Sequence, residues 1–528
     1  MSTRELPDRP NLEQLKKQAK SLLHDAEAGD AAALGRFRIL PAFADRPAAS
    51  LQSAGLALHD AQSVIAREHG FPSWNALREE VDARTMTFEA AVEEFLRCAT
   101  GGASGRARRL LARHPGIARA NLWTAIVLAD ADAVAARLSA DPSSATTPGG
   151  PQAWAPILYA CHTCVHEEQP GGADRLVGIV RDLMARGADP NAEYHWNWHP
   201  ELPRTVLWAS VCVIGHLPLA KALLEAGANP TDGVTSHIAG GGGNLAALEL
   251  LHRHGMNVNG VPGGVPPLVY MLFWSRNAAG PRWLVEHGAD PNLAWGADGE
   301  APLHVAARRW DVPMAEALVR HGADVTTRRA DGATPHTLAE LSGNHDVAEW
   351  LLAHGAEDQL SPLQRFMAAC ARGDRAAADR MLAARPALRA ELGPDQHLML
   401  QRPAESGNAA VLETMLACGF DPRVGDKDHV TPLHRAAMGG HPDAVRVLLA
   451  HGAPVDAADG MFAATPLVWA VEGRGHAAPA SDHVGVARLL IAAGSPLDWT
   501  PPEGAPSPER TQEALLELRR DAAARASG

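Results

Sequence analysis

The chain has 528 residues, of which 46% are hydrophobic, so it can bury a large core. Its formal net charge of −13 disfavours a nucleic-acid partner, and its six irregularly spaced cysteines are too few for a disulfide framework. No apolar stretch predicts a membrane span or a secretory signal, so we expect a cytoplasmic protein.

The first 85 residues predict a helical region of their own. Leucine and alanine recur at helical spacing over residues 11–40, and two further helical stretches flank a turn at 70–74. This region differs from the rest of the chain, which is built on a short repeat.

A glycine recurs along the remaining chain at a nearly constant spacing. It stands at Gly187, Gly227, Gly255, Gly288, Gly322, Gly355, Gly419, Gly452 and Gly494. The successive gaps are 40, 28, 33, 34, 33, 64, 33 and 42 residues, so a period near 33 prevails and the gap of 64 holds two units. One such unit cannot bury its own apolar face, and neighbouring units must therefore stack on it.

The unit at 431–457 has a readable local structure. Thr431 and Pro432 predict a helix start, because proline is tolerated in the first turn of a helix. Gly440 predicts the end of that helix, and an amphipathic second helix stops at Gly452 before an extended finger. In this pattern the units resemble ankyrin repeats. The best matches are residues 431–457, 301–327 and 333–358.

This resemblance implies an all-α ankyrin-repeat solenoid of about twelve helix-turn-helix units with β-turn fingers, over residues 86–500. Residues 87–150 and 361–422 are degenerate units. The family pattern implies that His237, His304 and His434 bond to neighbouring backbone. The region 1–85 resembles one that precedes the repeats in bacterial proteins of this family, and we expect it to cap the stack. Residues 501–528 predict a C-terminal capping helix and tail.

The resemblance also indicates which residues face the concave groove. In the family, the residue after the Thr-Pro-Leu-His position generally points there, and in the unit at 431–457 it is Arg435. Carried back to weaker units, the register predicts aromatic residues at this position: Tyr159, Tyr270 and, if Val206 stands for the leucine, Trp208, with Trp274 one turn after Tyr270. The chain has only 3 Tyr, so two of them at this position are poorly explained by chance.

The finger at 191–204 is longer than its counterparts and rich in large side chains. It contains Tyr194, His195, Trp196, Trp198 and His199, and a neighbouring finger contributes Trp295. Exposed aromatic side chains of this size usually cover something. The sequence therefore predicts an aromatic, histidine-bearing groove over repeats three to six. The alternative is that the insertion packs on its own stack, with the aromatic residues as filler.

Residues 161–168 contain side chains that could bind a metal ion. Cys161 and Cys164 have C-x-x-C spacing, and His162 and His166 lie four residues apart, as two ligands on one helix face do. However, Cys161 falls at an alanine position of the repeat, and no second C-x-x-C exists. We therefore favour buried packing over a metal site, and we expect no cofactor.

A general acid/base site is the remaining chemical hypothesis. Its candidates are His162, His195, His199 and Glu167, although no motif orders them. Because ankyrin arrays bind many partners and rarely catalyse, our main hypothesis is a scaffold that binds a protein or peptide in the groove. The alternative is a small-molecule binding protein or unusual enzyme whose pocket is closed by the finger 191–204.

Overall fold

The structure is a computed structural model in which paired helices account for most of the chain, as the sequence predicts. It describes residues 4–7, 9–40, 43–44, 47, 51, 55–168, 170–196, 199–473, 481–497, 499, 511, 515 and 518. The chain divides into two compact units, residues 1–293 and 294–528, and each is described by itself. The predicted C-terminal helix over 501–528 lies outside the described residues except at three positions.

The first unit begins with a small helical region that has its own core. Its helices are α1 (Leu12–Glu27), α2 (Ala31–Phe37), α4 (Leu58–Glu68) and α5 (Trp74–Thr85). The side chains of Leu22, Phe37 and Ile65 are buried together in one hydrophobic cluster. Asn11 and Asp30 cap α1 and α2 by accepting backbone N–H groups, as polar residues do at helix starts. Local capping and leucine spacing therefore account for this region.

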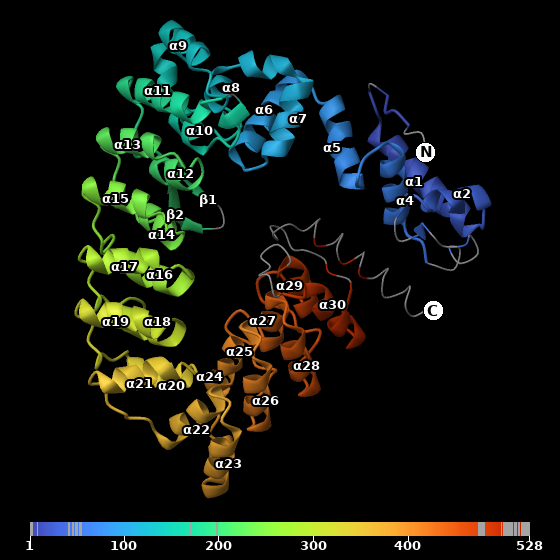
Figure 1. Ribbon diagram of the computed structural model, residues 1–528. Helices are drawn as coiled ribbons and strands as arrows, with labels where there is room; N and C mark the ends of the chain where they lie inside the picture. Colours follow the sequence, from blue (N-terminus) through green and yellow to red (C-terminus); the bar gives the residue numbers. More distant parts are fainter. Residues whose placement is uncertain are drawn as a thin grey trace. The chain divides into compact units, whose positions relative to one another are not determined.

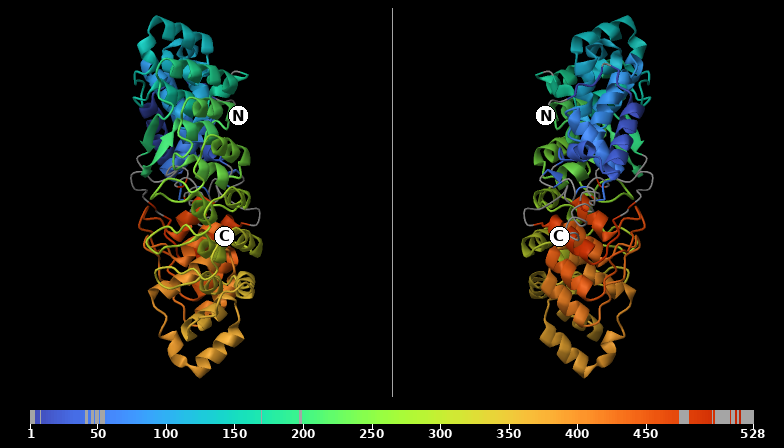
Figure 2. Two further views of the ribbon diagram at one scale, coloured as in Figure 1. Left: turned by 90° about the vertical axis from the view of Figure 1, so that its left-hand side faces the viewer. Right: turned by 90° about the vertical axis from the view of Figure 1, so that its right-hand side faces the viewer.

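Helix pairs follow in chain order through the rest of the first unit (Figure 1 and Figure 2). The pairs are α6 (Phe88–Thr100) and α7 (Ser104–Arg113), α8 (Leu122–Val127) and α9 (Ala131–Ala140), α10 (Pro156–His162) and α11 (Gly172–Ala185), α12 (Val206–Cys212) and α13 (Leu217–Glu225), α14 (Thr235–Gly241) and α15 (Leu245–Arg253), and α16 (Pro267–Trp274) and α17 (Ala279–Glu286). Short 3-10 helices η2 (Pro115–Arg119), η3 (Pro142–Ala145) and η4 (His166–Glu168) join some of them.

The second unit continues the same pattern. Its pairs are α18 (Pro302–Arg309) and α19 (Val312–Arg320), α20 (Pro335–Leu341) and α21 (His345–Ala353), α22 (Pro362–Ala371) and α23 (Arg375–Ala384), α25 (Gln401–Glu405) and α26 (Ala409–Ala417), α27 (Pro432–Gly439) and α28 (Pro442–Ala450), and α29 (Pro466–Gly473) and α30 (His483–Ala492). Between α23 and α25 lie η5 (Pro386–Arg389), α24 (Pro394–His397) and η6 (Leu398–Leu400). The pattern is weakest here, where the sequence is degenerate.

The repeat at 431–457 shows why these sequences fold into pairs. Thr431 is the N-cap of α27, Pro432 takes its first position, and Gly440 ends the helix with φ of 69°. His434 is fully buried and accepts the Thr431 N–H at 3.1 Å through Nδ1. Its Nε2 lies 3.1 Å from the carbonyl oxygen of Ala464 in the next finger. The expected bond from the repeated histidine to neighbouring backbone is confirmed here.

The same bond recurs in two further repeats. His237 Nε2 lies 2.8 Å from the Val265 carbonyl oxygen, and His304 Nε2 lies 3.2 Å from that of Ala333. Each of these histidines therefore ties one repeat to the finger of the next.

The long finger forms a β-hairpin rather than a simple turn. Strand β1 (Glu193–Trp196) pairs antiparallel with β2 (His199–Thr205), and the register shifts between His195 and Trp196. The hairpin lies beside α12, on the side of the first helices of the pairs (Figure 1). It contacts α12 through β2 and α10 through Tyr194. We define the inner face of repeats three to six as the face formed by α10, α12, α14 and α16. None of the described helices is both long and apolar enough to cross a membrane.

Candidate functional site

The β-hairpin sets two side chains opposite each other at the start of the inner face. Tyr194 in β1 and Arg204 in β2 are cross-strand partners, so they project to the same side of the hairpin. Thr205, the last residue of β2, also caps α12 by accepting the Trp208 N–H at 2.9 Å, and it donates to Asp232 Oδ2 at 2.6 Å. This double role of Thr205 ties the hairpin to helix α12 and to the next finger.

Four ring side chains meet beneath the hairpin. Tyr194 lies 4.3 Å from Trp154 and 5.1 Å from His162, measured between ring centroids. His162 lies 5.3 Å from Trp154 and 6.1 Å from Trp208. We call Trp154, His162, Tyr194 and Trp208 the aromatic cluster. It joins the finger before α10, helix α10, the hairpin and helix α12, and the three rings other than His162 remain partly exposed.

Tyr159 supports this cluster from inside the protein. Its side chain is fully buried, with its ring 5.6 Å from Trp154 and 6.5 Å from Trp123. Its hydroxyl lies within hydrogen-bond distance of the Gly149 carbonyl oxygen (2.9 Å) and Gln152 Oε1 (2.8 Å). Tyr159 therefore follows the predicted register but lies beneath the surface, because the finger at 149–154 folds over its ring.

His162 is the most unusual member of the cluster. Only 2% of its surface is exposed, and its Nδ1 lies 2.9 Å from the carbonyl oxygen of Leu158 in its own helix. Its Nε2 is buried without a hydrogen-bond partner. Burial lowers the pKa of this imidazole to about 4, so the side chain is neutral at pH 7. His162 therefore presents a neutral polar atom among aromatic rings.

Arg204 supplies the positive charge of this site. Its guanidinium carbon lies 4.3 Å from the ring centroid of Trp208, in a cation–π contact. Burial raises the pKa of Tyr194 and that of Tyr270, and the Arg204 charge opposes the rise in both. Arg204 therefore contacts Trp208 directly, and its charge also acts on Tyr194 of the hairpin and on Tyr270 of α16.

Trp208 does not occupy the position that the sequence predicted. Thr205 is the N-cap of α12, so Val206 takes the first helical position and Trp208 the third. Trp208 therefore stands where His434 stands in the regular repeat, and Ala209 takes the groove position of Arg435. The prediction assumed that Val206 corresponds to Leu433 of the regular repeat, and this is wrong: Val206 corresponds to Pro432. The Trp208 ring is half-buried, and its Nε1 is buried without a hydrogen-bond partner.

Two further predicted residues lie on α16. Tyr270 is half-buried and contacts His237 edge-on, with ring centroids 4.9 Å apart. Trp274 is 69% exposed and packs against Phe273, with ring centroids 4.8 Å apart. Tyr270 therefore has the half-buried character expected of a groove residue, and Trp274 offers a large apolar surface at the helix end.

The remaining finger residues divide into three groups. His195 is exposed, and its Nε2 lies 3.4 Å from Glu193 Oε1. The side chains of Trp196 and His199, and all of Trp198, lie outside the described residues. Trp295 is 43% exposed and belongs to the second unit, where it forms an isolated β-bridge with Glu300.

The candidate metal ligands are buried or lie close to backbone carbonyl groups. Cys161 is fully buried, which raises the pKa of its thiol and keeps it protonated. The thiol of Cys164 lies 3.6 Å from the Cys98 carbonyl oxygen, and His166 Nδ1 lies 3.1 Å from that of Thr163. Among the described residues, no three His, Cys, Asp or Glu side chains are grouped as metal ligands. The buried-packing interpretation fits Cys161 best.

The acid/base candidates differ from one another in their exposure to solvent. The Glu167 side chain is 80% exposed and lies 4.0 Å from its neighbour His166, while His162 is buried and neutral. His195 pairs with Glu193 at the hairpin surface. Glu167 and His162 therefore lie in different environments, one exposed to solvent and the other buried.

Two residues of the site escaped the sequence argument. Trp154 lies in the finger before α10, and its proximity to Pro156, which starts that helix, is the signal that places it near the groove. Arg204 directly precedes the helix cap Thr205, and the alternation of a hairpin strand would have indicated that it faces the same side as Tyr194. Both residues lie in fingers, where the helical register does not give the direction of a side chain.

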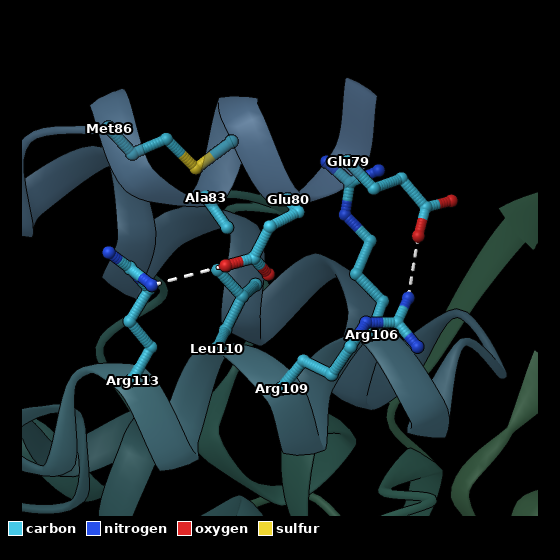
Figure 3. Close-up of a pocket in the computed structure, with 8 residues that line it drawn as sticks. All are labelled: Glu79, Glu80, Ala83, Met86, Arg106, Arg109, Leu110 and Arg113. Atoms are coloured by element: carbon cyan, nitrogen blue, oxygen red, sulfur yellow. Dashed lines mark hydrogen bonds and ion pairs between the residues drawn. The ribbon is translucent and has the colours of Figure 1, made fainter. Parts of the chain in front are cut away.

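A small pocket lies between α5 and α7, away from these residues. It has a volume of about 50 Å³ and is lined by Glu79, Glu80, Ala83, Met86, Arg106, Arg109, Leu110 and Arg113. Figure 3 shows two ion pairs in its walls, Arg109 to Glu79 at 2.5 Å and Arg113 to Glu80 at 3.3 Å. Ligand pockets usually have volumes of about 300 Å³ or more, so this pocket is too small for a typical ligand. The two ion pairs in its walls join α5 to α7.

Comparison with known proteins identifies the repeats. The family model "Ankyrin repeats (3 copies)" matches residues 275–361 and 400–498. The chain is similar to "Cyclin-dependent kinase 4 inhibitor B" of Bos taurus, with 37% identity over 112 residues, which are 21% of this chain and 84% of that protein. It is also similar to "Ankyrin repeat and SOCS box protein 11" of Danio rerio, with 36% identity over 102 residues, or 19% of this chain and 34% of that protein.

A third relative shows how limited some of these matches are. The "Nuclear factor NF-kappa-B p105 subunit" of Gallus gallus is 27% identical over 188 residues, which are 34% of this chain and 19% of that protein. The chain thus spans about a third or less of the second and third relatives. The family model also leaves out the residues of the aromatic cluster, which lie before residue 275. The repeating glycine, the helix pairs and the coverage of the Bos taurus relative together show that the chain belongs to the ankyrin-repeat family.

Proposed function

We propose that this protein is an interaction scaffold that binds a protein or peptide segment on the inner face of repeats three to six. Ankyrin repeats generally serve as scaffolds for protein interaction. The proposed contact residues are the exposed parts of Trp154, Tyr194 and Trp208, together with Tyr270 and Trp274. One similar protein, the "Cyclin-dependent kinase 4 inhibitor B" of Bos taurus, is named for its action on another protein.

The observation that carries the proposal is the partial exposure of several large rings on one face. Tyr194, Trp208 and Tyr270 come from separate elements, yet each is half-buried and each is acted on or contacted by Arg204. Trp274 adds an exposed indole at the end of α16. Tyrosine and tryptophan carry much of the binding energy of protein interfaces when a partner removes them from water.

Two polar atoms within the cluster depart from the packing of a regular repeat. Trp208 Nε1 and His162 Nε2 are buried without partners, and such atoms usually carry a free-energy cost of about 1–3 kcal/mol each. A folded protein retains that cost where the groups serve recognition rather than stability.

The proposal is tested by selecting peptides from a random displayed library on the wild-type protein. Selected peptides are then titrated against Tyr270→Ala and Trp274→Ala by fluorescence anisotropy. We expect each substitution to weaken binding about tenfold or more, because interface aromatic residues contribute about 2 kcal/mol when they are central. Trp274 is 69% exposed, so its removal leaves the core unchanged.

The matched control is Trp350→Ala, which removes an indole from α21 in the second helix of a repeat. Circular dichroism and thermal unfolding show whether each variant is folded. If Tyr270→Ala and Trp274→Ala bind the selected peptides as tightly as Trp350→Ala does, the inner face of repeats three to six is not the binding surface.

A further inference from the structure

We infer that the segment recognised on this face is basic and inserts an arginine side chain against Trp208, the place that Arg204 of the hairpin now takes. This inference rests on the proposed function and specifies the chemistry of the partner. In the structure, a guanidinium from the finger already contacts the Trp208 ring at 4.3 Å. Aromatic faces attract guanidinium groups, and the attraction strengthens as water is excluded. The cluster is therefore built to accept a cation of this shape.

The position of Arg204 makes it a tethered competitor. It is the residue before Thr205, whose bonds to Trp208 N and Asp232 Oδ2 hold this end of the hairpin against α12. A side chain held next to its site acts at an effective concentration in the millimolar range or above. An incoming arginine must displace Arg204, so the hairpin weakens binding of a partner and selects against weak ones.

The surrounding charge favours a basic partner. The whole chain has a net charge of −13, and residues 150–275 contain more Asp and Glu than Lys and Arg. Glu193 is exposed on the face of β1 opposite to Tyr194, where it pairs with His195. Asp232 lies beside the site through its bond to Thr205. Complementary charge raises the rate of encounter and excludes acidic segments.

The rings near Arg204 also suit a planar cation better than an ammonium. Tyr194 and Tyr270 both lie within the electrostatic range of the guanidinium, and Trp208 lies directly beneath it. Arginine stacks on such faces and donates hydrogen bonds in the plane of its head group, whereas lysine presents a compact, strongly hydrated charge. We therefore expect arginine peptides to bind more tightly than lysine peptides of the same length.

The test uses three synthetic fluorescent peptides of one length and glycine-serine background, which carry two arginines, two lysines or two glutamates. Each is titrated against the full-length wild type, Arg204→Ala and Arg204→Met by anisotropy at fixed ionic strength. Arg204→Met keeps the apolar stem and so controls for packing of the hairpin. We expect both variants to bind the arginine peptide about tenfold more tightly than the wild type does. We expect each protein to bind the lysine peptide more weakly than the arginine peptide. Trp350→Ala should bind as the wild type does.

Three results overturn the inference. Equal or weaker binding of the arginine peptide to both Arg204 variants excludes self-competition, as does the absence of binding by any of these peptides. Binding of the glutamate peptide to the wild type, with loss in both variants, makes Arg204 itself the receptor for a carboxylate. In each case the peptides selected from the random library still report separately on the proposed function, because their loss of affinity on Tyr270→Ala and Trp274→Ala does not depend on charge.

Discussion

The repeat that starts at Thr431 and the repeat that starts at Thr205 use the same helix cap but differ at the third helical position. In the first, His434 is fully buried and bonds both to the cap and to the next finger, at Ala464. In the second, Trp208 takes that position and its Nε1 has no partner. The regular repeat uses the position to hold the stack together, whereas the irregular repeat turns it into part of an aromatic surface.

The same comparison extends to other repeats of the array. Two repeats that follow the aromatic cluster along the chain, those of α14 and α18, keep the stabilising bond through His237 and His304. The repeat under the β-hairpin gives it up, and the same repeat carries Arg204 in cation–π contact. Leu158, Val269 and Val468 take the same third position in α10, α16 and α29, so the missing bond is shared with other repeats and the Arg204 contact is what distinguishes the α12 repeat.

The strongest test of this comparison removes the stabilising residue from the regular repeat. We expect His434→Ala to lower the free energy of unfolding by about 2–4 kcal/mol, because it leaves the Ala464 carbonyl unpaired and a cavity between repeats. Urea unfolding followed by circular dichroism measures the change. His321→Ala, an exposed histidine of the same unit, is the control and should change stability by less than about 0.5 kcal/mol. A small effect of His434→Ala would remove the basis of the comparison.

A second buried histidine should have the opposite effect. His336 takes the second position of α20, where Leu433 stands in the regular repeat, and it is 1% exposed with neither ring nitrogen hydrogen-bonded. We expect His336→Leu to raise the free energy of unfolding by about 1–3 kcal/mol, because an apolar side chain replaces a buried unsatisfied one. The measurement is again urea unfolding, with the exposed His354→Leu as control. No gain would mean that His336 has a polar partner.

Much of this architecture was predictable from local sequence. The glycine period, Thr431 with Pro432, and Gly440 define helix ends through backbone geometry alone, and the structure has them where expected. The repeated histidine was also predictable, because its bonds stay within one repeat and the next finger. Tyr270 followed the same register, and the structure places it half-buried on α16.

The aromatic cluster was only partly predictable, and the reason is geometric. Trp208 was placed one position too far along its helix, since Val206 at the first position resembled a core leucine. The burial of Tyr159 depends on a finger that folds back over it, which no helical spacing encodes. Arg204 and Trp154 come from fingers, where side-chain direction depends on strand pairing and turn shape rather than on a fixed period.

A smaller effect should follow when the irregular repeat is restored to the regular pattern. In Trp208→His, the imidazole is expected to bond to the cap and to the backbone of the next finger, as His434 does. We expect stability to rise by about 1 kcal/mol, which is the net value of such a hydrogen bond after the loss of part of the indole surface. Binding of the selected peptides should fall in the same variant. A loss of stability would show that the Trp208 ring is needed for packing.

The smallest effect at pH 7 is expected for His162→Phe, which removes one bonded and one unbonded ring nitrogen. The pKa of His162 is about 4 in the folded protein, whereas an unfolded histidine titrates near 6.5. The unfolded state therefore binds more protons, and the wild type loses stability as the pH falls from about 6.5 towards about 4. Phenylalanine cannot bind that proton. The free energy of unfolding of the variant, relative to that of the wild type, should therefore rise as the pH falls from about 6.5 towards about 4.

Urea unfolding of both proteins between pH 7.5 and about 4.5 measures this relative stability. Histidines such as His237 and His434, whose pKa values are also lowered by burial, are present in both proteins, and their contributions cancel. A difference that stays constant across the range would mean that the His162 imidazole titrates as it does in water. The ring would then be accessible to solvent, and the aromatic cluster would be more open than its ring distances indicate.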